Sequence, residues 1–203
     1  APRLDAQISS QTPVPICIVS WNSRGSSKQK LQLMNKLVSQ EIVGEKIPIL
    51  CNQENFLLKA NMYKLFQEVP GFRFFVNPAI KDTQDRGRPM NGMFICVPDR
   101  IKSCVSDVSP GHWRVQAVII SRENTKTLLI NSYFPVDQRE GGEDGHDLDE
   151  TISVIKNIIR KSGCNTVMLV GDINADYTRN SHHTRTVKAS TEELQLVTAW
   201  NNY

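Results

Sequence analysis

The stretch Thr166–Asp176, TVMLVGDINAD, constrains the fold more than any other part of this chain. It opens with the short apolar run Val167–Val170, bounded by turn residues, which is typical of a strand buried on both faces of a sheet. After Gly171, the polar residues Asp172 and Asn174 stand at alternate positions, so in an extended segment their side chains point the same way. Such a pair at the end of a buried strand suits a bound cation or phosphate. The same letters also suit a turn with an Asx cap, and this stretch alone leaves both interpretations open.

Length and composition favour one domain that works in a reducing compartment. The chain has 203 residues with 39% hydrophobic and 22% charged residues, as expected for a single sizeable core. Its net charge of +3 is compatible with a nucleic-acid partner. The five scattered cysteines form neither a disulfide framework nor a zinc pattern, which indicates an intracellular protein. No apolar run approaches membrane-spanning length, so we expect no membrane partner. We expect a flexible arm over 1–13 and one domain over 14–203.

The order of apolar patterns predicts an α/β protein. Apolar strands at Ile16–Ser20 and Ile47–Cys51 flank an amphipathic helix at Lys28–Val43. Capping-box spacings predict two later helices, one opening at Asp147 and one at Ser190. Further strands are expected at Phe72–Val76, Met93–Val97, Ile101–Val105, Trp113–Ser121 and Thr127–Phe134. Consecutive strands between the helical ends indicate mixed or antiparallel pairing, unlike a simple parallel Rossmann sheet.

Polar residues follow three of the apolar strands at the point where each ends. These residues are Asn22, Glu54, and the pair Asp172 and Asn174. Sites in α/β sheets collect outside strand ends, so we expect the four side chains to converge. Two carboxylates and two amides form an oxygen ligand set that favours Mg²⁺, or Mn²⁺, over zinc. Glu54 suits the metal ligand, Asp172 a base for an attacking water, and the two asparagines orienting roles, which predicts metal-assisted hydrolysis of a phosphoester.

Four motifs in this order resemble the endonuclease/exonuclease/phosphatase family. They are WNSRG at Trp21–Gly25, NQEN at Asn52–Asn55, NSYFP at Asn131–Pro135 and GDINAD at Gly171–Asp176. Within that family the chain is most similar to the apurinic-endonuclease-like domain of non-LTR (LINE-type) retrotransposons. The resemblance implies a four-layer α/β/β/α sandwich of two mixed, mostly antiparallel sheets.

The resemblance also implies an Mg²⁺-dependent endonuclease that nicks DNA and leaves a 3′-hydroxyl to prime reverse transcription. Glu54 matches the metal-binding Glu of the family, with Asn22 beside it. Tyr133 matches the active-site Tyr near the scissile phosphate. Asp172 matches the Asp that aligns or deprotonates the water, and Asn174 the Asn that contacts the phosphate. Where repair-type apurinic endonucleases carry an Asp, this chain has Arg24, which favours the retrotransposon branch.

One part of the family pattern is missing. The family closes with a strand bearing Ser-Asp-His, preceded by a strand with an Asp, and this sequence contains neither. We therefore expect a chain that lacks its C-terminal strands. Losing such a charge stabiliser typically lowers the rate about 10²–10⁴-fold, so we expect this chain to cut poorly.

Double-stranded DNA is the expected partner, and two polar loops carry basic residues that either contact phosphates or form a solvated face. The candidate DNA-binding residues are Arg24, Arg86, Arg88, Arg179, His182, His183 and Arg185. The implied context is a monomeric domain acting in the nucleus, with a reverse transcriptase domain on the same polyprotein. Two alternatives stay open: a family relative that hydrolyses another phosphoester, such as a phosphoinositide or poly(A), and a degenerate DNA-binding module that does not cut.

Overall fold

A computed structural model describes residues 14–38, 44–81, 87, 89–137 and 145–198. Within these residues, eight strands and four α-helices follow one another with two short 3₁₀ turns. The elements are β1 (Ile16–Asn22), α1 (Lys28–Leu37), β2 (Ile47–Gln53), η1 (Lys59–Asn61), α3 (Tyr63–Glu68), β3 (Phe72–Asn77), β4 (Met93–Pro98), η2 (Asp99–Cys104), β5 (Val105–Asp107), β6 (Val115–Arg122), β7 (Thr125–Tyr133), α4 (Gly145–Ser162), β8 (Thr166–Asp172) and α5 (His182–Glu193).

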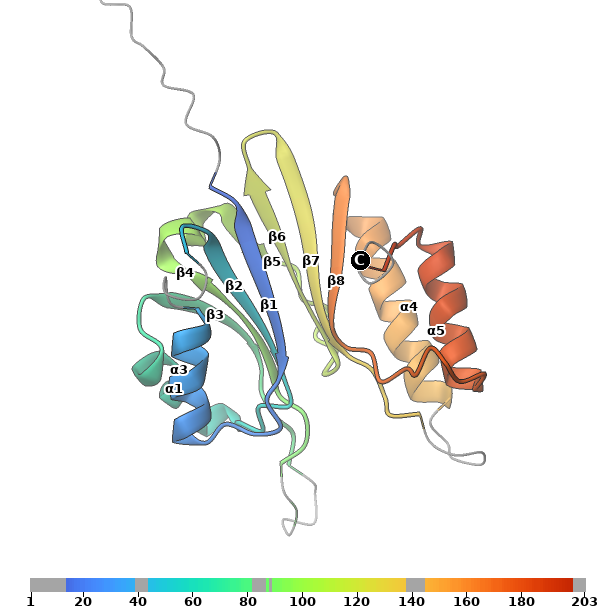
Figure 1. Ribbon diagram of the computed structural model, residues 1–203, viewed down its shortest axis with the longest axis horizontal. Coiled ribbons are helices and arrows are strands. Elements are labelled where there is room, and N and C mark those ends of the chain that lie inside the picture. The colour runs from blue at the N-terminus through green and yellow to red at the C-terminus, as the bar shows by residue number, and fades with distance from the viewer. Residues whose placement is uncertain (1–13, 39–43, 82–86, 88, 138–144, 199–203) are drawn as a thin grey trace, which may run out of the picture.

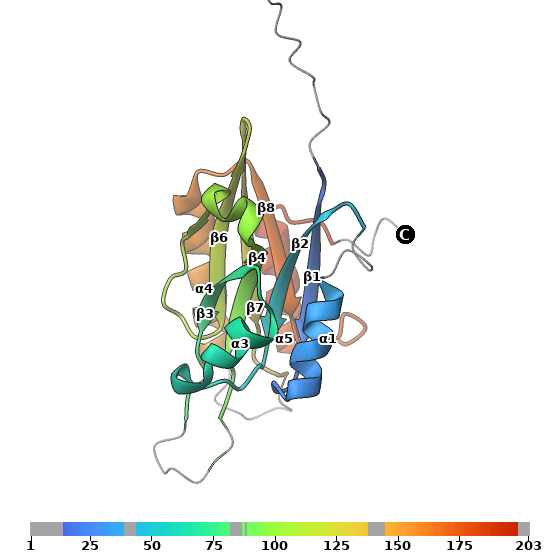
Figure 2. The same cartoon turned by 90° about the vertical axis from the view of Figure 1, so that its left-hand side faces the viewer.

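The strands form two mixed sheets that pack face to face between helices (Figure 1). One sheet has the order β1-β2-β4-β3 and the other the order β5-β6-β7-β8. Each sheet contains one parallel pair, β1 with β2 and β7 with β8, and its other pairs are antiparallel. Helices α1 and α3 cover the outer face of the first sheet, and α4 and α5 cover the second, as the turned view also shows (Figure 2). The predicted four-layer sandwich is confirmed.

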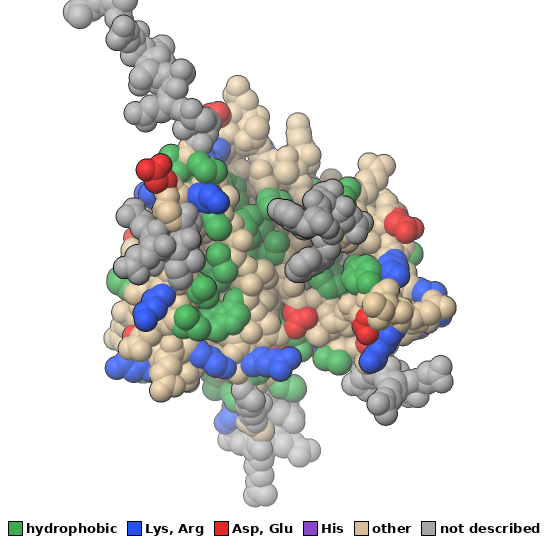
Figure 3. All heavy atoms as spheres, viewed as in Figure 1, with side chains coloured by type: hydrophobic (Ala, Val, Ile, Leu, Met, Phe, Trp, Pro, Cys, Tyr) green, Lys and Arg blue, Asp and Glu red, His purple; other side chains and the backbone are tan. Residues whose placement is uncertain are grey.

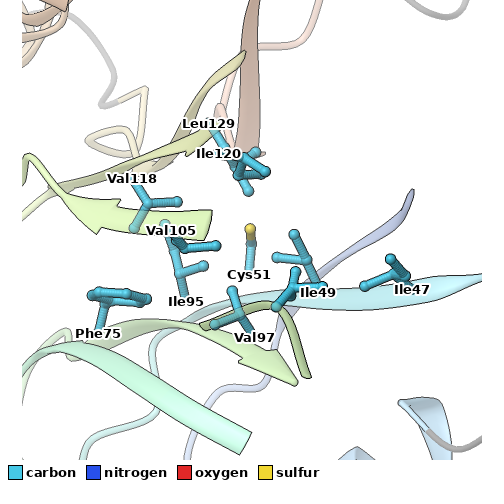
Figure 4. Packing of buried hydrophobic residues seen from close by; sticks show 11 residues of the cluster. Ile47, Ile49, Cys51, Phe75, Ile95, Val97, Val105, Val118, Ile120 and Leu129 are labelled. Carbon is cyan, nitrogen blue, oxygen red and sulfur yellow. The ribbon is translucent and has the colours of Figure 1, made fainter. Parts of the chain in front are cut away.

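Three apolar clusters hold the layers together. The central cluster lies between the two sheets and contains Ile49, Cys51 and Ile95 from one sheet with Val118 and Leu129 from the other (Figure 4). A second cluster packs α1 and α3 onto their sheet, and a third packs α4 and α5 onto theirs. Because both faces of each sheet are covered, a shift of one residue in a strand would exchange the side chains between two apolar layers, so the register of the strands is fixed.

The first helix begins where the sequence predicts and its stripe faces the core. Ser27 caps α1 by accepting a hydrogen bond from the Lys30 amide at 3.3 Å. Leu31 and Met34, one helical turn apart, are 2% and 0% exposed. The helix ends at Leu37, and the rest of the segment predicted as helix runs into residues 39–43, which lie outside the described part of the chain.

Several sequence-based boundaries were wrong, including that of the helix predicted to open at Asp147, which already contains Gly145 and His146. Ile101 lies in the 3₁₀ turn η2, and only Val105 of the predicted strand Ile101–Val105 joins β5. The helix predicted to open at Ser190 instead begins at His182, with Ser181 as its cap. Both serines suit an N-cap, but only the earlier start places Val187 in the interior, and Ser190 then lies in the last turn of α5.

Strand β8 differs from the prediction in its burial. Among the described strands it pairs with β7 alone, at the end of its sheet, and Met168 is 40% exposed. An apolar groove of about 580 Å³ runs along this strand and is bordered by α4, α5 and the segment 194–198. The apolar run therefore forms an edge strand that faces a groove. The sequence did not indicate this, because an apolar run of this length is equally typical of a central strand.

The described helices include none that combines the length and the apolar character needed to cross a membrane. All five cysteines are free. Burial raises the pKa of the Cys96 thiol to about 12, so this thiol stays protonated and packs as a small apolar side chain.

Candidate active site at the strand ends

Four strands from both sheets end at the same edge of the molecule. Because β1 runs parallel to β2 and β7 runs parallel to β8, the carboxyl ends of each pair lie together. Figure 1 shows these ends at the lower edge of the sandwich. The strands end at Asn22, Gln53, Tyr133 and Asp172, and Glu54 follows directly after Gln53. The site is thus assembled from chain segments that are far apart in sequence.

Asn22 and Asp172 join the tips of the two sheets. The side-chain amide of Asn22 donates a 2.7 Å hydrogen bond to Oδ2 of Asp172, across 150 positions of sequence. The remaining oxygen of each side chain accepts a backbone N–H: Asn22 Oδ1 from Arg24 at 3.1 Å, and Asp172 Oδ1 from Asn174 at 3.2 Å. Both polar groups are half-buried and held at both ends, so their orientation is fixed before any substrate arrives.

Tyr133 and Glu54 meet beside this pair. The Tyr133 hydroxyl hydrogen-bonds the Glu54 carboxylate. Burial raises the pKa of Tyr133 to about 12, helped by this hydrogen bond and by the negative charges of Glu54 and Asp172, while the Arg114 charge opposes the shift. The phenol therefore remains protonated at neutral pH and can act as a hydrogen-bond donor.

The backbone at these strand ends adopts unusual conformations. Arg24, Glu54 and Asn174 have φ angles of +47°, +53° and +49°, in the left-handed region that side chains other than Asn and Asp rarely adopt. Such strain clusters at functional sites, where surrounding contacts hold it in place. Here Gly25 donates a 2.6 Å backbone hydrogen bond to the Glu54 carbonyl, which ties the β1 turn to the β2 turn.

Asn174 reaches the site differently from the sequence-based expectation. Strand β8 ends at Asp172, and the left-handed turn at Asn174 breaks the alternation that would place the two side chains on one face. The backbone N–H of Asn174 contacts Asp172, and its side-chain amide donates to the Phe134 carbonyl at 2.8 Å. Asn174 thereby holds the β8 turn against the segment that follows Tyr133.

Comparisons with known proteins agree on the fold. No protein-family model and no curated protein match the sequence. Solved structures do match, among them the endonuclease domain of TRAS1, a telomere-specific non-LTR retrotransposon, with a TM-score of 0.60 and 16% identity over 89% of this chain and 72% of that one. The AP endonuclease LMAP from Leishmania major matches with a TM-score of 0.56 and 14% identity over 86% of this chain and 65% of that one.

A third match names the architecture. It is an endonuclease/exonuclease/phosphatase family protein from Leptotrichia buccalis, with a TM-score of 0.54 and 11% identity over 85% of this chain and 72% of that one. The chain has the endonuclease/exonuclease/phosphatase fold. It spans 65% to 72% of the length of these three structures. At such low identities the likeness is one of fold, and two of these three matching structures are endonucleases.

The donor set at the strand ends suits a divalent metal. Glu54 offers a carboxylate, Asp172 a second one, and Asn22 an amide oxygen, all half-buried at one edge of the sheets. Hard oxygen ligands of this kind, with space left for water and phosphate, are typical of Mg²⁺ and Mn²⁺ sites. The chemistry of these three side chains therefore fits a divalent cation.

A second group of potential ligands lies elsewhere, on the first turns of α4. The ligand atoms of His146, Asp147 and Glu150 lie within 4.8 Å of one another. Asp147 already pairs with Arg114, at 3.2 Å between Oδ2 and Nη2. The negative charge of Asp147 is therefore partly neutralised, which weakens the group as a set of metal ligands. We assign no metal site to it.

The candidate DNA-binding residues separate into three groups. Arg24, Arg179 and Arg185 are exposed, and Figure 3 shows Lys and Arg side chains gathered along the lower edge, where the strands of the site end. Arg179 pairs with Asp176 at 3.0 Å, and Arg185 donates to the Asn180 carbonyl at 2.8 Å. The second group, the predicted contacts Arg86 and Arg88, lies outside the described residues.

The third group, His182 and His183, was expected in a polar loop, and that expectation is wrong. Both residues form the first turn of α5. His182 is exposed, but His183 is only 7% exposed, so its ring packs inward and does not reach a DNA backbone in this conformation. Because Ser181 caps a helix that begins at His182, His183 lies on the buried face of α5 with Thr184 and Val187.

Sequence reasoning missed Arg114, which borders the site. Its guanidinium lies 5.5 Å from the centre of the Tyr133 ring. In the sequence it is one charged residue ahead of an apolar strand, and nothing in its local pattern distinguishes it from a solvated arginine. Only the pairing of β6 with β7 brings it next to Tyr133.

Proposed function

We propose that this chain is the endonuclease domain of a retrotransposon polyprotein, which nicks double-stranded DNA in a reaction that depends on Mg²⁺ or Mn²⁺. The nick would leave a 3′-hydroxyl that primes reverse transcription by a second domain of the same polyprotein, in the nucleus. The observation that carries this proposal is the 2.7 Å hydrogen bond between Asn22 and Asp172, which sets the two sheet tips side by side with Glu54 and Tyr133 around them. Such a group of acidic, amide and phenol side chains suits phosphodiester hydrolysis.

Each residue has a role that follows from its contacts. Glu54 and Asn22 would hold the cation, which supplies positive charge to the scissile phosphate. The Asp172 carboxylate is oriented by hydrogen bonds to both of its oxygens and would take a proton from the attacking water. Tyr133 stays protonated and would donate to the phosphate as charge develops. Asn174, held by the Phe134 carbonyl, would contact a second phosphate oxygen.

Sequence and charge support DNA as the substrate. The exposed Arg24 lies in the turn directly after β1, the exposed Arg185 lies in the first turn of α5, which follows β8 in the chain, and the chain is net positive. Phosphate contacts of this kind position a duplex without reading its sequence. The support for the retrotransposon assignment over a repair enzyme comes from the four motifs of the sequence and from Arg24, because the fold is shared by the TRAS1 endonuclease domain and the AP endonuclease LMAP alike.

Plasmid nicking tests the proposal. Supercoiled plasmid is incubated with the protein and Mg²⁺, and the relaxed form is measured over time for the wild type, Glu54→Gln, Asp172→Asn and Asn22→Ala. We expect each substitution to lower the rate about 10²–10⁴-fold and EDTA to abolish it. Glu192→Gln, on the exposed side of α5, serves as the control and should keep the rate within about twofold.

The same samples show which chemical group the nick leaves at its 3′ end, and they test the two alternative functions. A nick with a 3′-hydroxyl is extended by a DNA polymerase without prior phosphatase treatment. Duplex binding without nicking, at any tested metal concentration, would identify a DNA-binding module. Release of phosphate from a phosphoinositide, or of nucleotides from poly(A), in the absence of nicking would identify a relative with another phosphoester substrate.

A further inference from the structure

The side chain of Arg114 is enclosed by three groups at the rim of the candidate site. Its guanidinium lies 3.8 Å from the centre of the Trp113 ring and 5.5 Å from that of Tyr133. Nη2 lies 3.2 Å from Oδ2 of Asp147, and only 11% of the Arg114 side chain is exposed. A cation stacked on aromatic rings and paired with a carboxylate has little freedom to move.

The backbone of Arg114 is also bound to the strand that carries Tyr133. Its carbonyl accepts the Tyr133 N–H at 3.0 Å and the Ser132 hydroxyl at 3.1 Å. One residue therefore holds Tyr133 at two points, the backbone through its carbonyl and the ring through its guanidinium.

The far side of this arrangement is anchored on the first turns of α4. Asp147, which pairs with Arg114, accepts a 2.7 Å hydrogen bond at its carbonyl from Thr151 Oγ1, within the helix. His112 stacks on Trp113, with ring centres 6.0 Å apart and an angle of 24° between the planes, and its Nε2 lies 3.7 Å from Glu150 Oε1. The helix and the stack of rings together make a rigid support behind Arg114.

We propose that Arg114 is a positioning residue that, held by Asp147, fixes the ring of Tyr133 for phosphodiester cleavage. This inference rests on the function proposed above, since it gives Arg114 a part in that reaction. Arg114 acts through Tyr133 rather than on the substrate, because its guanidinium is buried and already paired. A substrate-binding arginine would lower affinity when removed, whereas a positioning residue lowers the turnover of bound substrate.

Steady-state nicking of an oligonucleotide duplex separates these two roles. Arg114→Met keeps the length and apolar stem of the side chain but removes the charge and the planar fork. We expect kcat to fall about 10–100-fold with KM within about threefold, since small misplacements of a reacting group have effects of this size. Arg114→Lys should recover part of the loss, and Asp147→Asn should lower kcat about 3–10-fold, because the stacking on Trp113 remains.

A control on the same helix isolates this effect from general destabilisation. Lys156 pairs with Glu193 at 2.6 Å and links α4 to α5, with no described contact to Tyr133. Lys156→Met should leave kcat within about twofold. A normal kcat in Arg114→Met, or a loss that lies only in KM, would overturn the proposal.

A measurement that needs no activity completes the test. The chain has four tyrosines, so protein labelled with 3-fluorotyrosine gives few ¹⁹F resonances, and Tyr133→Phe assigns the one from Tyr133. In Arg114→Met we expect that resonance alone to shift or broaden, and in Lys156→Met we expect it to stay. An unchanged Tyr133 resonance in Arg114→Met overturns the positioning role. If the folded wild type does not nick DNA, the proposed function fails, and the ¹⁹F spectra still decide whether Arg114 positions Tyr133.

Discussion

Gln53 and Asn131 form a hydrogen bond between the two sheets in the interior of the protein. Nε2 of Gln53 donates to Oδ1 of Asn131 at 2.6 Å, and the two residues are 1% and 0% exposed. The Asn131 amide then donates to the carbonyls of Asn52 and Phe94, at 3.0 Å and 3.2 Å, in the first sheet. Gln53 directly precedes Glu54 in the sequence, and Asn131 lies two positions before Tyr133. The hydrogen bonds between the sheets therefore set the separation of the strand ends that carry the site.

We expect Asn131→Leu to lower the free energy of unfolding by about 2–4 kcal/mol. The apolar side chain has a similar size but removes one hydrogen bond from the Gln53 amide and one from each of two buried backbone carbonyls. Urea denaturation followed by circular dichroism measures the change. Asn157→Leu, on the exposed side of α4, is the control and should shift stability by less than about 0.5 kcal/mol. A similar small shift for Asn131→Leu would show that the network contributes little to stability.

Gly171→Ala should destabilise the protein far more than Gly163→Ala. A Cβ at Gly171 would lie 1.8 Å from the Ser132 carbonyl oxygen, and its φ is +136°. Gly163 also has a positive φ, +61°, but a Cβ there meets nothing within 4 Å. We expect a loss of about 1 kcal/mol at Gly163, from backbone strain alone, and more than about 3 kcal/mol at Gly171. Thermal unfolding of both variants tests this, and equal losses would contradict the close packing of β8 on β7.

Tyr133→Phe should lower kcat about 10–100-fold without moving the limbs of the pH–rate profile. With a pKa of about 12, the wild-type phenol does not titrate in the range where the protein is assayed, so any alkaline limb below about pH 10 belongs to another group. Nicking rates from about pH 6 to pH 10 for both proteins provide the measurement. An alkaline limb that disappears in the Phe variant would show that Tyr133 ionises much earlier than its burial indicates.

His112 should make the protein less stable as the pH falls below about 6.5. Burial lowers the pKa of His112 from its usual 6.5, although the nearby Glu150 charge opposes this. Below that pH the unfolded chain takes up a proton that the folded protein does not yet bind, so folding weakens until the pH passes the lower folded-state pKa. Denaturation at about pH 7, 6 and 5 should show a shallower fall for His112→Gln than for wild type. Asn157→Gln, an exchange of one uncharged side chain for another at an exposed position of α4, should leave the slope unchanged.

DNA affinity should fall steeply with salt, and the exposed arginines near the site should account for part of the slope. Each phosphate contact adds about 0.9 to the slope of log K against log salt concentration for duplex DNA. We expect Arg24→Ala and Arg185→Ala each to reduce it by about that amount. Arg100→Ala is the control, since Arg100 binds the carbonyl of Lys46 at the amino end of β2, opposite the site. A flat salt response in the wild type would contradict binding led by phosphate contacts.

Most of the secondary structure and the identity of the residues at the strand tips were predictable from local signals. Apolar runs such as Ile47–Cys51 and caps such as Ser27 depend on near neighbours in the chain, so they can be read without the fold. The predicted start of the last helix was wrong because two local signals competed. Ser181 and Ser190 both suit a helix cap, and burial of Val187 against the sheet decided between them.

The sequence by itself determined an α/β sandwich with Asn22, Glu54, Tyr133 and Asp172 at strand ends, because periodicity and short motifs are local properties of the chain. Only the tertiary structure decided that these ends meet, that β8 forms an edge of its sheet, and that Arg114 lies between Tyr133 and Asp147. Those relationships join residues up to 150 positions apart. They depend on how the two sheets and α4 pack, which no local pattern specifies.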